Sequence, residues 1–268
     1  MPRERRWPRP GSRGGAPSRR MICMAIPHLD STSASSWLDG AHVEESVWAL
    51  RPDYVAVLMV ATGLTPGPSD AASEAVLREA EASARAMVGD GLPEAVGHVA
   101  AWREAYRGFG AKPQRTRSSV EALLRRVGDG LPRIDRLTDA YNAVSIANAT
   151  PLGGEDLEAY AGPLRLVRAS GDEDFEVMSG GARASEPPEA GEVVWRDDLG
   201  VTCRRWNWRQ CVRTRLTESS TSAVFICDVL DVEPGDAVAR AATVQEDLVA
   251  ALERVSPCVD LTTRTLRR

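Results

Sequence analysis

Residues 204–220 of the chain read RRWNWRQCVRTRLTESS and could contact a nucleic acid. Trp206 and Trp208 lie two residues apart among five arginines. Indole rings stack on bases and guanidinium groups bind phosphates, so one interpretation is a site that holds the end of an RNA. In the other interpretation the two tryptophans share one face of a strand and pack in the core. We favour the core interpretation because tryptophans at strand spacing are usually buried.

The polar residues of the same stretch favour a binding cleft. Asn207, Arg209 and Gln210 flank the tryptophans at the expected end of a strand, where side chains can line a cavity. Glu218, in the segment LTESS, has two interpretations. It is either a base or ammonium-binding group, or an ordinary loop carboxylate.

The charge distribution restricts how this chain can bind RNA. The net charge is −5, and residues 1–20 carry seven arginines and one glutamate, which leaves −11 for the rest. An acidic body disfavours general attraction to nucleic acid, so contacts must come from local patches. Residues 102–136 are such a patch, with nine basic and four acidic residues. It is either a solvated helix face or a docking surface, led by Lys112, Arg115 and Arg117.

Several classes of protein are excluded by composition. No run of residues approaches the roughly 18 to 20 apolar residues of a membrane-spanning helix, so no membrane partner is expected. Residues 1–20 lack the apolar segment of a signal peptide and indicate a disordered tail or a misassigned start. The five cysteines form no CxxC pair and the three histidines have no ligand spacing, so we expect no metal and no cofactor. This cysteine usage fits a reducing cytoplasm.

The hydrophobic pattern predicts an α+β protein with helices first and mostly antiparallel strands second. Residues 30–40 are rich in serine and are expected to form a loop. Helices are predicted over residues 70–89, 92–106, 118–127, 135–147 and 236–254. Strands are predicted over residues 54–61, 164–170, 175–178, 192–195, 199–206 and 222–230. We expect a single domain with one core over residues 41–235. Residues 1–40 are expected to form an N-terminal extension, and residues 236–268 a C-terminal helix and tail.

Three segments of the chain contain elements and motifs in the same order as a known domain. Residues 138–160 read TDAYNAVSIANATPLGGEDLEAY, a helix followed by a Pro-Leu turn. Residues 161–181 give a strand, an acidic turn, a strand and a double glycine, and residues 204–228 contain Trp-Asn-Trp-Arg and Arg-x-x-x-Thr-Glu. This order resembles the B3/B4 domain, the editing module of the phenylalanyl-tRNA synthetase β subunit, and its stand-alone bacterial relatives. The resemblance implies a β-sandwich-like sheet system flanked by helices.

The resemblance also implies where the pocket lies. Asp139 and Asn142 match the Asp-x-x-Asn helix motif of the family, and Pro151, Leu152 and Asp156 match the turn that follows it. The histidine in the amino-acid-reading part of the family's pocket falls on Gly153. We therefore expect a different amino acid to be read here.

The implied activity is hydrolysis of the ester of a mischarged tRNA by a trans-acting aminoacyl-tRNA deacylase. Catalysis in this family is expected to rely on a positioned water and on the tRNA ribose hydroxyl, and the sequence has no GxSxG elbow. The ester carries a threonine analogue such as a halogenated threonine, or another non-cognate amino acid such as tyrosine. The alternatives are a non-catalytic tRNA- or amino-acid-binding module of the same fold, and an unrelated small-molecule enzyme.

The candidate residues fall into three groups. The catalytic group is Asn142, Gly153, Gly154 and Glu218. The substrate-binding group is Asp139, Glu155, Asp156, Gly180, Trp206, Asn207, Trp208, Arg209 and Gln210. The tRNA-binding group is Lys112, Arg115, Arg117, Arg213 and Arg215. Simpler roles remain open: a helix-end turn for the two adjacent glycines, and caps of the next helix for Glu155 and Asp156.

One spatial relationship decides whether these groups form a site. The segment around Asn142 and Gly153 must converge with the Trp-Asn-Trp-Arg segment. The space between them must hold an aminoacylated adenosine and a water.

Overall fold

The computed structural model describes residues 31–268, so the interpretation of residues 1–20 as a tail or misassigned start lies outside the described residues. At the centre is a four-stranded antiparallel sheet in the order β11-β2-β10-β3. Its strands are β2 (Val55–Thr62), β3 (Leu152–Asp156), β10 (Ser222–Val229) and β11 (Asp260–Leu266). Every residue of β2 and of β10 is buried, because both faces of this sheet are covered.

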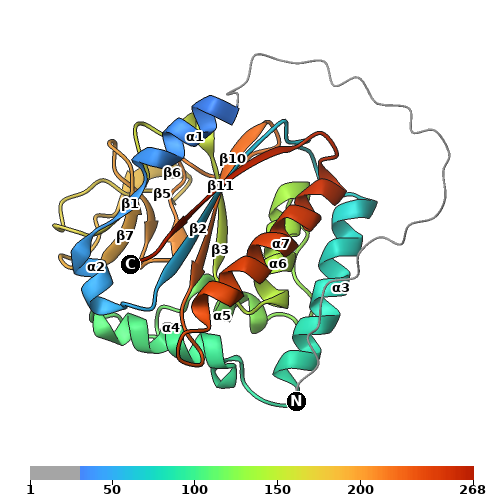
Figure 1. The fold of residues 1–268 in the computed structure, drawn as a ribbon, viewed down its shortest axis with the longest axis horizontal. Coiled ribbons are helices and arrows are strands. Elements are labelled where there is room, and N and C mark those ends of the chain that lie inside the picture. Colours follow the sequence, from blue (N-terminus) through green and yellow to red (C-terminus); the bar gives the residue numbers. More distant parts are fainter. Residues whose placement is uncertain (1–30) are drawn as a thin grey trace.

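Three helices cover one face of the four-stranded sheet (Figure 1). They are α3 (Ala71–Val88), α6 (Arg136–Ala147) and α7 (Ala237–Val255). The side chain of Asp70 accepts hydrogen bonds from the first-turn amides of Ala72 and Ser73, and α3 ends at Gly89, whose φ is 57°. These are ordinary start and stop signals, and the predicted helices over 70–89, 135–147 and 236–254 are confirmed.

A second sheet packs against the opposite face. It has the order β1-β4-β7-β8-β9, with β1 and β4 parallel and the other pairs antiparallel. Its strands are β1 (His42–Val43), β4 (Arg165–Arg168), β7 (Val193–Arg196), β8 (Val201–Arg204) and β9 (Arg209–Gln210). The predicted α+β class, with sandwich-like sheets flanked by helices, is confirmed (Figure 1).

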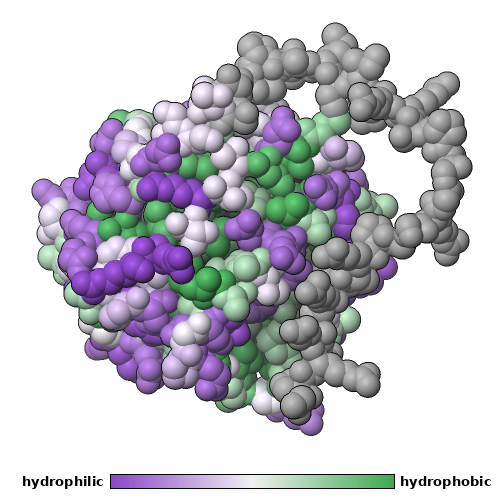
Figure 2. Space-filling view, viewed as in Figure 1, coloured by the Kyte–Doolittle hydropathy of each residue, from purple (hydrophilic) through white to green (hydrophobic). Residues whose placement is uncertain are grey.

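The remaining elements surround these two sheets. The helices are α1 (Ser31–Gly40), α2 (Glu45–Leu50), α4 (Gly97–Gly108) and α5 (Ser119–Leu124), with short 3-10 turns at Pro93–Ala95 and Leu157–Ala159. A separate hairpin consists of β5 (Glu176–Ser179) and β6 (Ala182–Ser185). On the face drawn in Figure 2, hydrophilic residues surround small apolar patches, as expected where the apolar side chains pack inside.

The apolar side chains form separate clusters on the two faces of the four-stranded sheet, because alternate side chains of β2 point to opposite faces. Val55, Val57 and Met59 join the cluster under the three helices. Ala56 and Leu58 join a second cluster shared with the five-stranded sheet. The space between the two sheets is therefore apolar, and it contains the cavity described below.

Three local predictions are corrected. Residues 31–40 form helix α1 instead of a loop, since Ala34 and Leu38 bury their side chains in the second cluster. The expected Gly153–Gly154 turn is part of strand β3, because it pairs with β10. The expected C-terminal tail contains β11, which pairs with β2 along its length. In each case tertiary packing overrides a weak local preference.

Candidate functional site

A cavity of about 260 Å³ opens at the edge of the four-stranded sheet formed by β3. Gly153 and Glu155 of β3 line it together with Ile226 and Asp228 of β10, which lie on the same face of the sheet. The other walls come from the five-stranded sheet and from α5 and α6. Among the residues that line the cavity are Asn142, Trp206, Asn207, Trp208, Arg209 and Gln210. The structure thus brings the Asn142–Gly153 segment and the Trp-Asn-Trp-Arg segment to one cavity, as expected.

Glu155 is a fully buried carboxyl group in the cavity wall. Its Oε2 accepts hydrogen bonds from the Tyr160 hydroxyl at 2.6 Å and from the Thr214 hydroxyl at 2.7 Å. Its Oε1 is buried and has no hydrogen-bond partner within the described residues. Burial raises the pKa of Glu155, while the two hydroxyl donors lower it. A buried oxygen without a partner is costly, so this atom is suited to a hydrogen-bond donor of a ligand.

Asp228 is a second buried carboxyl group in the same wall, and it is not among the candidates selected from the sequence. The Tyr54 hydroxyl donates to its Oδ1 at 2.5 Å, and the Asn207 side-chain amide donates to its Oδ2 at 3.2 Å. Burial raises the pKa of Asp228 to about 7, against the lowering effect of these two hydrogen bonds. A carboxyl group with a pKa near neutrality exchanges protons readily at physiological pH.

Asn207 is held in place from both ends of its amide. Its Oδ1 accepts a hydrogen bond from the Tyr106 hydroxyl at 3.0 Å, and its Nδ2 donates to Asp228. Its backbone carbonyl accepts from the amide of Ser119 at the start of α5, at 2.9 Å. Asn207 therefore fixes the position of Asp228 and joins the 205–208 turn to the cavity mouth.

Trp206 and Trp208 lie in a turn between β8 and β9, not in a strand as predicted. Arg205 and Trp206 have positive φ angles of 48° and 68°, which end the alternation of a strand. Trp206 is completely buried, and its ring centroid lies 4.9 Å from that of Tyr54. Trp208 is partly buried, with the Arg205 guanidinium 4.5 Å from its ring centroid. Trp206 therefore belongs to the core, and Trp208 forms part of the cavity wall.

Asn142 and Gly153 contribute different features to the cavity. The Asn142 side chain is buried in the wall, and its amide makes no hydrogen bond to another described residue. Gly153 lets the side chain of Gln210 approach closely: a Cβ at this position would lie 2.7 Å from Gln210 Nε2. That nitrogen donates to the carbonyl of Gly154 at 3.1 Å and so ties β9 to the edge of β3.

Two arginines form the basic rim of the cavity, defined here as Arg126 and Arg209. Both line the cavity and both have exposed side chains. Arg126 follows α5 and was not selected from the sequence, whereas Arg209 lies in β9. Since Glu155 and Asp228 are buried, the cavity is acidic at the bottom and basic at its mouth.

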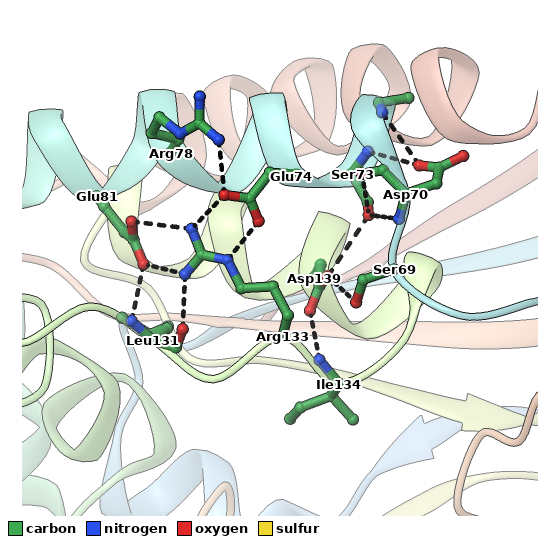
Figure 3. Close-up of polar contacts among 11 residues, drawn as sticks. Ser69, Asp70, Ser73, Glu74, Arg78, Glu81, Leu131, Arg133, Ile134 and Asp139 are labelled. Carbon is green, nitrogen blue, oxygen red and sulfur yellow. Dashed lines mark hydrogen bonds and ion pairs between the residues drawn. The ribbon is translucent and has the colours of Figure 1, made fainter.

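Asp139 matches the family motif but is not among the residues that line the cavity. Figure 3 shows its contacts with Ser69, Ser73 and Ile134. Its carboxyl group accepts hydrogen bonds from the Ser69 hydroxyl at 2.6 Å and from the backbone amide of Ile134 at 3.0 Å. A longer contact of 3.5 Å joins it to the Ser73 hydroxyl in α3. Burial raises the pKa of Asp139. The side chain joins α6 to the start of α3 and does not reach the substrate position expected for it.

Four other candidates also lie away from the cavity lining. Gly154 packs on the opposite face of β3, where a Cβ would meet Phe225 at 2.8 Å. The carboxyl group of Asp156 accepts from the amide of Glu158 and caps a 3-10 turn. Glu218 is exposed in a loop, and Gly180 lies at the turn of the β5–β6 hairpin. Asp156 and Glu218 therefore have the simpler roles of a cap and a loop carboxylate, whereas Gly154 is a strand residue and not part of a helix-end turn.

The basic candidates occupy several different environments. Lys112 and Arg115 are exposed and line a second cavity of about 490 Å³. Arg117 forms an ion pair with Glu121 at 3.4 Å. Arg213 is held by both oxygens of Asp197, at 2.8 and 2.9 Å, and so is part of the scaffold. The Arg215 side chain is exposed. Its backbone forms an antiparallel bridge with Glu155 and therefore lies next to β3.

The sequence contained one overlooked signal for Asp228. The strand SAVFICDVL carries a single charged residue within an apolar, fully buried run. An ionisable group in such a strand is costly to bury and is therefore a candidate for function. No comparable signal marks Arg126, because its role depends on the position of α5 beside the cavity.

Across residues 31–268, no group of three or more His, Cys, Asp or Glu side chains could hold a metal ion. No helix in this described range is long and apolar enough to cross a membrane.

Comparison with known proteins places the chain in a family. No curated protein matches the sequence. Among solved structures, the fold is similar to an N-terminal fragment of the phenylalanyl-tRNA synthetase β subunit from Pyrococcus horikoshii, with 10% identity and a TM-score of 0.42. That match covers 85% of this chain and 54% of the other, so the chain spans about half the length of that fragment. The B3/4 domain family matches residues 101–259, which include every residue that lines the first cavity. The chain belongs to the B3/4 domain family.

Proposed function

We propose that this protein is a trans-acting hydrolase of aminoacyl-tRNA esters, with a threonine analogue or another non-cognate amino acid as the esterified group. The observation that carries the proposal is the polarity of the cavity. Its buried end holds the carboxyl groups of Glu155 and Asp228, and its mouth holds Arg126 and Arg209. An aminoacylated 3′ end has the complementary polarity, since it carries an ammonium group at one end and phosphates at the other.

Different side chains of the cavity bind different parts of the substrate. Glu155 Oε1, the buried oxygen without a partner, accepts from the ammonium or hydroxyl group of the amino acid. The Asn142 amide, which has no described hydrogen-bond partner, binds the ester or the attacking water. Trp208 and Arg209 contact the terminal adenosine and its phosphate.

The reaction requires no covalent intermediate with the protein. Water adds to the ester carbonyl carbon, giving a tetrahedral oxyanion, and the bond to the ribose oxygen then breaks. The ribose oxygen leaves with a proton, so the products are a free amino acid and a tRNA with its terminal hydroxyl restored. Asp228, whose pKa lies near 7, accepts the proton from water as its carboxylate and then gives it to the leaving ribose oxygen.

The direct test is amino-acid release from a panel of mischarged tRNAs by the purified protein. The panel carries threonine, a halogenated threonine and tyrosine, among other amino acids. We expect release above the spontaneous rate from at least one tRNA, and loss of most of this activity in Asn142→Ala. Glu79→Gln, which removes an exposed ion pair with Arg254 on the helical face, serves as the control. No release from any ester contradicts the proposal, and tRNA binding without release supports the non-catalytic module instead.

A further inference from the structure

A second cavity, with three basic residues in its lining, lies next to the first. This basic groove is lined by Lys112, Arg115 and Arg205, and also by Glu189 and Glu192, which both lie within ion-pair distance of Arg205. Its volume is about 490 Å³. Lys112 and Arg115 are exposed, and neither forms an ion pair with a described residue.

The basic groove and the first cavity are separated by a single layer of side chains. The Arg205 guanidinium lines the groove and lies 4.5 Å from the ring centroid of Trp208, which lines the first cavity. Arg209, at the rim of the first cavity, follows Trp208 directly. A strand of RNA whose last nucleotide enters the first cavity would therefore place its preceding phosphates near the basic groove.

The acidic loop 186–192, with the sequence EPPEAGE, lies across this basic surface. Its carboxylates interact with the arginines in two distinct ways. Glu192 is buried and holds Arg204 through two hydrogen bonds of 2.8 and 2.9 Å. Glu186 and Glu189 are exposed and lie 3.5 Å from Arg209 and 3.6 Å from Arg205, respectively.

The buried Glu192–Arg204 pair is therefore structural, whereas the exposed pairs of Glu186 and Glu189 can be exchanged for other partners. Breaking a buried, bidentate pair leaves a charge without a partner and is strongly destabilising. Exposed pairs at longer distances contribute little, so a phosphate can replace either carboxylate at small cost. Two prolines between Glu186 and Glu189 restrict the loop and hold both carboxylates over the arginines.

We propose that Glu186 and Glu189 act as exchangeable counterions on the tRNA-binding surface, and that phosphates of the tRNA 3′ end displace both when tRNA binds. This inference rests on the proposed function, since it assumes that tRNA is the partner. The acidic loop then lowers the affinity for RNA in general and favours partners whose 3′ end also enters the first cavity.

The test measures binding of uncharged tRNA to the full chain as a function of salt concentration. The double variant Glu186→Gln/Glu189→Gln is expected to bind about three- to tenfold more tightly at low salt, because phosphates no longer compete with two carboxylates. The matched control is Glu79→Gln, an exposed glutamate paired with Arg254 away from the groove. Unchanged or weaker binding by the double variant, or an equal gain in the control, overturns the inference.

A second pair of variants tests the groove itself. Lys112→Gln and Arg115→Gln are expected to weaken tRNA binding, and each to reduce the steepness of the salt dependence by about 0.7. An unchanged salt dependence in both variants also overturns the inference. Because the probe is uncharged tRNA, this result is independent of hydrolysis. Binding that follows these expectations without any ester hydrolysis contradicts only the proposed activity, whereas hydrolysis with unaltered binding in the glutamate variants contradicts only the inference.

Discussion

The hydroxyl of Tyr54, the residue just before β2, donates a 2.5 Å hydrogen bond to Oδ1 of Asp228 in β10. Both residues are buried, and Asp228 lines the cavity. The hydroxyl stabilises the carboxylate form, while burial favours the protonated form. The protonation state of Asp228 thus depends on its burial and on hydrogen bonds from residues outside β10.

This pair predicts a pH dependence of hydrolysis. Burial raises the pKa of Asp228 to about 7, so the rate should rise with pH through about 7 as the carboxylate forms. Tyr54→Phe removes a hydrogen bond that lowers this pKa, and the midpoint should move to higher pH by about 0.5 to 1 unit. The pH–rate profile of kcat/KM measures both effects. A midpoint that moves down, or a rate independent of pH near 7, would exclude Asp228 as the base.

Asp228 also predicts how stability changes with pH. The native carboxyl keeps its proton up to about pH 7, whereas the unfolded one loses it near the ordinary value of 3.8. Between these values the native state binds more protons, so the contribution of Asp228 to stability falls as pH rises. In Asp228→Asn the amide mimics the protonated carboxyl and does not titrate, so this variant should not lose the contribution of Asp228 to stability as pH rises.

Urea unfolding at about pH 5 and about pH 7.5 tests this sign. Relative to the wild type, Asp228→Asn should gain about 2 kcal/mol in free energy of unfolding between the two conditions. The comparison between proteins cancels the contributions of other titrating groups. A stability difference that stays constant with pH would show that Asp228 ionises normally in the native state.

Gly153→Ala should disturb the cavity wall. Its Cβ would lie 2.7 Å from Gln210 Nε2, so the Gln210 amide must shift and its hydrogen bond to the Gly154 carbonyl is weakened. Because Nε2 is the end of a flexible side chain, we expect a loss of about 0.5–1.5 kcal/mol in stability and reduced hydrolysis. Gly128→Ala is the control, because a Cβ there meets no atom within 4 Å. Combining Gly153→Ala with Gln210→Ala should recover part of the stability; failure to recover any would mean that the clash is not with Gln210.

Glu155→Gln should weaken substrate binding while leaving the stability of the fold almost unchanged. The Tyr160 and Thr214 hydroxyls can donate to the amide oxygen as they do to Oε2, so the thermal midpoint should change little. The amide nitrogen then replaces the acceptor Oε1, and binding of an ammonium group should weaken by about tenfold or more. Steady-state kinetics should show a higher KM with a smaller change in kcat. An unchanged KM would remove Glu155 from the substrate site.

The sequence by itself determined the elements that carry strong local signals. The Asp70 cap and Gly89 define the ends of α3, and the apolar, β-branched run of β2 predicts a buried strand. Family resemblance pointed to Asn142 and to the segment 206–210, all of which line the cavity. The helix and strand signals depend on residues close together in the chain, so local spacing is sufficient to predict them, whereas the place of Asn142 was implied by the resemblance.

The tertiary structure decided the features that depend on burial and on distant partners. Residues 31–40 are helical because they pack on the second cluster, and β3 is a strand because β10 lies beside it. Asp139 and Asn142 share one helix, yet Asp139 meets Ser69 while Asn142 faces the cavity. Asp228 becomes a candidate base only because β10 buries it beside Tyr54 and Asn207. The desolvation and hydrogen bonds that set its pKa come from segments far apart in the chain, and only the folded protein brings them together.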